Sequence, residues 1–110
     1  MKIQHNNLQK RWHELSFFEQ MANVGSEVER ALSWRDKGNK EYSIIAFERA
    51  LELLDFTTED LKEMHRLREL KRLREALVDY FTQTNIYGSN PKLWHSYFYA
   101  FNYAARLKIK

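Results

Sequence analysis

Apolar residues recur every three or four positions along most of this chain, which is the period of an amphipathic helix. Four stretches have this pattern, and short polar segments separate them. The pattern therefore predicts four helices, over residues 16–36, 39–56, 58–83 and 91–107. A short extra helix over residues 3–13 would use Leu8, Trp12 and Leu15 as its apolar positions.

Local signals mark where these helices begin. Ser16 and Glu19 have the spacing of a capping box, in which each side chain binds the backbone amide of the other residue. Asn90 is typical of a helix cap, and Pro91 follows it at the first helical position. The break between the second and third helices is expected at Thr57–Asp60, where a threonine would cap the third helix.

Four amphipathic helices with short connections predict an all-α fold, specifically an antiparallel up-down-up-down four-helix bundle. A length of 110 residues fits a single domain, and 3 glycines and 1 proline are too few for the many turns of an all-β protein. A three-helix core with the first or last helix docked elsewhere is the alternative. Gly25 falls on the apolar side of the first helix, where we expect it to permit close approach of a neighbour.

The last helix has two distinct faces when its residues are placed at about 100° intervals. The face expected to point into the core carries Trp94, Tyr97, Phe98, Phe101, Ala104 and Ala105. The opposite face carries Lys92, His95, Tyr99, Tyr103, Arg106 and Lys110. This second face is aromatic and basic and contains no acid, so we regard it as the candidate interaction face. The alternative is that its tyrosines lie along the edge of the bundle, or under residues 1–13, and that its bases are solvated.

The charges are distributed unevenly around a net charge of +3. Residues 14–60 hold 11 of the 15 acids, whereas residues 80–110 hold four bases and no acid. On the second helix the acids Glu41, Glu48, Glu52 and Asp55 form a stripe. Such segregation is expected where the charges pair within the chain, where a basic face meets the acidic stripe of a second copy, or where it binds another anionic partner.

Arg74 lies within the apolar line of the third helix, so its guanidinium must either reach solvent or be paired. We predict a partly buried ion pair with Glu27 or Glu48, with Glu29 as a further candidate partner. A ligand-binding arginine between helices is the alternative interpretation.

The remaining bases of the third helix include Arg68 and Arg72, which share a face with Glu75 and Asp79. Bases and acids on one helical face are typical of a solvated helix that carries salt bridges. We therefore expect salt bridges on this face rather than a binding site.

Signatures of catalysis are weak in this sequence. There is no cysteine, and the 4 histidines have no spacing typical of metal ligands. Glu52 and Asp55 match half of the Glu-x-x-Glu and Glu-x-x-Asp pattern of the all-α nucleoside triphosphate pyrophosphatases, but the other half is absent. We expect no enzymatic activity, no cofactor and no metal, and we retain a metal-dependent nucleotide hydrolase only as a remote third class.

The sequence favours a non-enzymatic interaction protein, an oligomeric or accessory subunit that uses the outer face of its last helix. Its partner would be a second copy or another protein. The alternative is a nucleic-acid-binding accessory protein that uses the acid-free C-terminal face and the basic N-terminus. No apolar run is long enough to cross a bilayer, so no membrane partner is expected, and a cytoplasmic location is predicted.

Overall fold

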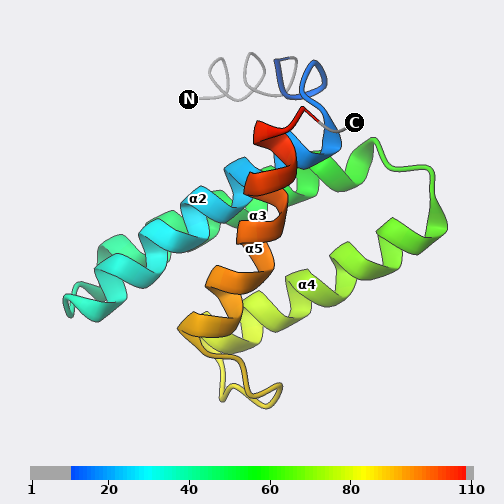
Figure 1. Cartoon of the computed structure of the whole chain (residues 1–110). Helices are drawn as coiled ribbons and strands as arrows, with labels where there is room; N and C mark the ends of the chain where they lie inside the picture. The colour runs from blue at the N-terminus through cyan, green and yellow to red at the C-terminus, as the bar shows by residue number, and fades with distance from the viewer. Residues whose placement is uncertain (1–10, 109–110) are drawn as a thin grey trace.

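The computed structural model describes residues 11–108, and these residues form helices without strands. The four helices are α2 (Phe17–Asp36), α3 (Lys40–Glu59), α4 (Met64–Thr82) and α5 (Pro91–Arg106). The predicted all-α, four-helix fold is therefore confirmed (Figure 1). Most of the predicted N-terminal helix, residues 3–10, lies outside the described residues.

The helices pack around α2 and α3, which lie side by side and point in opposite directions (Figure 1). The hydroxyl of Ser43 on α3 donates to the carbonyl of Ala31 on α2 at 2.8 Å, close to the turn that joins the two helices. α5 packs against α2, and α4 packs against α3. From the loop that joins them, α4 and α5 diverge (Figure 1).

Large apolar side chains from all four helices, together with Trp12, form one core. Met21 and Val24 of α2, Leu54 of α3 and Leu77 of α4 are completely buried. α5 contributes Trp94 and Phe98, while Tyr97 and Phe101 pack beside them. The core-facing side of the last helix is thus the side that its sequence pattern predicts.

The predicted helix starts at Ser16 and Asn90 are confirmed. The backbone amide of Glu19 donates to the Ser16 hydroxyl at 3.2 Å, and the Glu19 carboxylate accepts from the Ser16 amide at 2.8 Å. These hydrogen bonds to Ser16 hold the pKa of Glu19 below its usual value. At the start of α5, the amide of Leu93 donates to the Asn90 side chain at 2.9 Å.

The predicted boundary at Thr57–Asp60 is wrong, because α3 continues to Glu59 and α4 begins only at Met64. The buried hydroxyl of Thr57 accepts a hydrogen bond from the Trp12 indole at 2.9 Å and donates to the carbonyl of Leu53 at 3.1 Å. Its hydroxyl therefore bonds to groups inside the fold and does not cap the next helix.

Gly25 permits the close approach of α5 that its position predicts. A Cβ atom built at this glycine would lie 2.8 Å from Cβ of Phe98 and 2.9 Å from two of its ring carbons. Real Cβ atoms essentially never come that close to another side chain. Contact between α2 and α5 at this point therefore requires glycine.

Candidate interaction surface

The outer face of α5 carries three large side chains that the core does not use. Tyr99 is 59% exposed, Tyr103 is 51% exposed and Leu107 is 55% exposed. They are spaced four positions apart, with Leu107 the C-cap residue just after α5, so they follow one line along the helix. The two tyrosine rings stack with their centroids 6.3 Å apart. We call these three residues the α5 ridge.

The ridge contains one residue that the sequence analysis missed. Leu107 continues the spacing of Tyr99 and Tyr103, but the predicted helix ended at this residue and only the tyrosines and bases were assigned to the face. The spacing of four residues is the signal that could have found it. Its exposure makes the ridge more apolar than the sequence analysis predicted.

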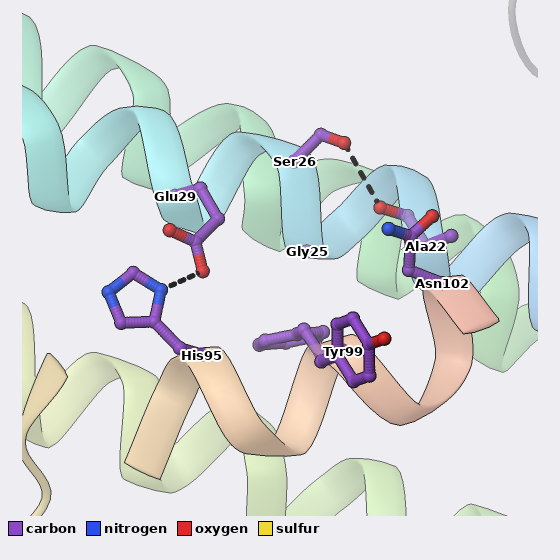
Figure 2. Close-up of a pocket in the computed structure, with 8 residues that line it drawn as sticks. Ala22, Gly25, Ser26, Glu29, His95, Tyr99 and Asn102 are labelled. Atoms are coloured by element: carbon purple, nitrogen blue, oxygen red, sulfur yellow. Dashed lines mark hydrogen bonds and ion pairs between the residues drawn. The ribbon is translucent and has the colours of Figure 1, made fainter. Parts of the chain in front are cut away.

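The bases of the predicted face differ in their surroundings. Lys92 and Arg106 are exposed beside the ridge, whereas Lys110 lies outside the described residues. His95 is paired through its Nδ1 with the carboxylate of Glu29 on α2 (Figure 2). The face is therefore not free of acids in space, because α2 places a carboxylate on it.

A shallow hollow of about 250 Å³ lies between α2 and α5 beside the ridge (Figure 2). Small residues on α2, namely Ala22, Gly25 and Ser26, make room for it. Tyr99 and Asn102 line its α5 side. A hollow of this size, next to exposed tyrosines, can receive one side chain of a partner.

The outer face of α3 offers a second exposed surface, which carries acids and also the base Arg49. Tyr42 and Ile45 on this helix are 50% and 57% exposed. Glu41 and Glu48 lie exposed on the same helix. We call these four residues the α3 patch. Its apolar part borders a hollow of about 390 Å³, which Arg30 and Arg49 also line.

Arg74 does not form the predicted buried pair with Glu27 or Glu48. Its Nε and Nη2 atoms bind the two carboxylate oxygens of Asp55 on α3 at 2.9 and 3.2 Å, and both side chains remain partly exposed. The prediction was wrong because α4 packs on the side of α3 that presents Asp55. Glu48 stays exposed on α3.

Glu27 has partners of its own. Glu27 is only 9% exposed. Its carboxylate lies 3.1 Å from Arg30 on the same helix and 3.9 Å from Arg49 on α3. Burial of this carboxylate is tolerated because two cations lie beside it.

Glu52 and Asp55 on α3 are the carboxylates that the sequence offers for a metal-dependent reaction. Between residues 11 and 108, no group of three or more histidine, aspartate or glutamate side chains is placed to hold a metal ion. The carboxylate of Asp55, the last residue of the Glu-x-x-Asp pattern, forms an ion pair with Arg74. In the same part of the chain, no helix has both the length and the apolar character needed to cross a membrane.

Comparison with models of known protein families, with curated proteins and with solved structures finds no match to this chain.

Proposed function

We propose that this chain is a non-enzymatic interaction protein that works as a subunit of an oligomer, and that the α5 ridge is its contact surface. The observation that carries the proposal is the line of three large side chains, Tyr99, Tyr103 and Leu107, each more than half exposed. Tyrosine is favoured at protein interfaces because it brings a large contact area and a polar group on a side chain with few rotatable bonds. Isolated exposed apolar residues are ordinary, but a contiguous line of them marks an interaction site.

The proposed partner is a second copy of the chain, bound through its α3 patch. The ridge is flanked by the bases Lys92 and Arg106, while the α3 patch combines apolar side chains with the acids Glu41 and Glu48. Complementary charge of this kind orients partners and discourages wrong ones. Because every copy carries both surfaces, a two-fold dimer would make the same contact twice.

Light scattering over a concentration series tests this proposal. We expect the apparent mass to rise to that of a dimer or larger, and we expect the double substitution Tyr99→Ser/Tyr103→Ser to return it to that of a monomer. Ile86→Ser is the matched control, because Ile86 is 84% exposed but lies on the loop before α5. A wild-type protein that remains monomeric at millimolar concentration would contradict the proposal.

Nucleic acid is the second candidate partner, and the stacked pair of exposed tyrosines favours it. Aromatic rings can stack on bases while Lys92 and Arg106 bind phosphates. The Glu29 carboxylate on the same face works against a phosphate backbone. This candidate predicts binding that weakens steeply with salt and is lost when Tyr99, Tyr103 and Arg106 are replaced together. Absence of any binding to DNA or RNA at low salt would eliminate it.

A further inference from the structure

A groove of about 730 Å³ lies between α4 and α5, on the other side of α5 from the ridge. The α4 wall is formed by His65, Arg68, Glu69, Arg72, Leu73 and Ala76. These residues are spaced three and four apart, so they form one continuous face of α4. At a rise of about 1.5 Å per residue, that face is roughly 17 Å long, or about three turns.

Apolar side chains line part of the groove. Leu73 and Trp94 are buried in its walls, and Leu93 lies 54% exposed along the α5 side. The buried indole N–H of Trp94 has no hydrogen-bond acceptor within residues 11–108.

The rim of the groove is basic because its arginines are not paired with the acids that share their helix. Arg68 and Arg72 are exposed, and neither forms an ion pair in the described part of the chain. Asp79 is buried and accepts two backbone amides of the loop before α5, each at 3.0 Å. The Glu75 carboxylate accepts from the hydroxyl of Tyr87 at 3.2 Å. The prediction that this face of α4 carries salt bridges is therefore wrong, and the guanidinium groups of Arg68 and Arg72 remain available to bind a partner.

One acid, Glu69, lines the groove, but its carboxylate already accepts a hydrogen bond from a neighbouring side chain. The Tyr97 hydroxyl donates to the carboxylate of Glu69 at 2.8 Å. Burial and this carboxylate raise the pKa of Tyr97 well above its ordinary value, so the phenol keeps its proton. The α5 wall contributes no acid, because residues 80–110 contain none. A ligand in this groove therefore meets an excess of positive charge.

We propose that this groove binds an acidic amphipathic helix of a partner protein. Two diverging helices form its walls, and the α4 wall, about three turns long, matches the length of a short helix. Leu73, Ala76 and Leu93 would receive that face, while carboxylates along its edge would meet Arg68 and Arg72. This site is separate from the α5 ridge, so both surfaces can be occupied in one molecule.

The test uses a fluorescein-labelled peptide with leucines spaced three and four apart on one helical face and glutamates on both flanks. Its binding to the full chain is followed by fluorescence anisotropy. We expect saturable binding and a loss of about tenfold or more in Arg68→Glu/Arg72→Glu, because like charges then face each other. A peptide with lysine in place of each glutamate should bind this variant better than it binds the wild type.

Two further variants make the result specific. Lys37→Glu/Lys40→Glu makes the same charge change at the turn between α2 and α3, away from the groove (Figure 1), and should leave binding unchanged. Leu93→Ser, at an exposed position, should weaken binding of both peptides because it removes an apolar contact. No binding of the glutamate peptide at millimolar protein, or equal loss in both charge variants, would overturn the proposal. Displacement of the peptide by a single-stranded oligonucleotide that needs the same arginines would overturn it in favour of nucleic acid.

Discussion

Replacement of Gly25 by alanine tests the packing of α5 on α2 most sharply. The residue sits in the middle of α2, where alanine is ordinarily the better helix former by about 1 kcal/mol. Helix propensity alone therefore predicts that Gly25→Ala stabilises the protein. The geometry predicts the reverse, because the new Cβ would lie 2.8 Å from Cβ of Phe98.

The magnitude follows from which atoms overlap. A ring can swing aside at small cost, but Cβ of Phe98 is fixed to the α5 backbone, so relief requires the two helices to separate. Overpacking of this kind typically costs about 1–3 kcal/mol, and the fixed position of Cβ places this case near the upper end. After the propensity gain of about 1 kcal/mol is subtracted, we expect a net loss of about 2 kcal/mol in the free energy of unfolding.

Urea denaturation followed by far-ultraviolet circular dichroism measures this loss as a lower midpoint with an unchanged slope. Ser26→Ala is the control, because Ser26 is an exposed neighbour on the same helix and its replacement reports helix propensity without the overlap. If Gly25→Ala proved as stable as the wild type or more stable, the close contact between α2 and α5 would be refuted.

Two further predictions concern the loop before α5 and the Tyr97 hydroxyl. Asp79→Ala removes the acceptor of two loop amides and should lower the free energy of unfolding by about 1.5–3 kcal/mol in urea denaturation, with Asp79→Asn losing less; an unchanged midpoint would refute the anchoring role. The second prediction follows from the raised pKa of Tyr97. Below about pH 10 its hydroxyl is protonated in both the folded and the unfolded chain, so titration of this group does not change the free energy of unfolding. Above that pH the unfolded chain releases the proton first. The free energy of unfolding of the wild type should therefore fall by about 1.4 kcal/mol per pH unit relative to that of Tyr97→Phe. If the two proteins lost stability in parallel as the pH rose, this prediction would be contradicted.

The parts of the fold that depend on neighbouring residues could be predicted from the sequence. The starts of α2 and α5 follow from Ser16 and Asn90, whose side chains bind amides three residues away. The start of α4 could not be found in this way, because the hydroxyl of Thr57 is bound by Trp12, 45 residues earlier. The sequence does not show that Trp12 and Thr57 form this hydrogen bond. Without it, Thr57 would be a typical N-cap residue for the next helix.

The same distinction holds for the candidate surfaces. Helical geometry alone places Tyr99 and Tyr103 on the outer side of α5, and both are exposed there. Glu29 joins that face only because α2 packs against α5, so no pattern within the last helix could reveal it. The partner of Arg74 depends on how α4 packs against α3, and this packing places Asp55 rather than Glu48 beside the guanidinium.

The claim that the α5 ridge is the contact surface is tested most directly by amide chemical shifts recorded as the protein concentration rises. If a second copy binds as proposed, the amides of Tyr99, Tyr103 and Leu107 should shift together with those of Tyr42 and Ile45, and all five should stop shifting at the same concentration. Shifts confined to other parts of the chain, or none at all at millimolar concentration, would contradict the claim.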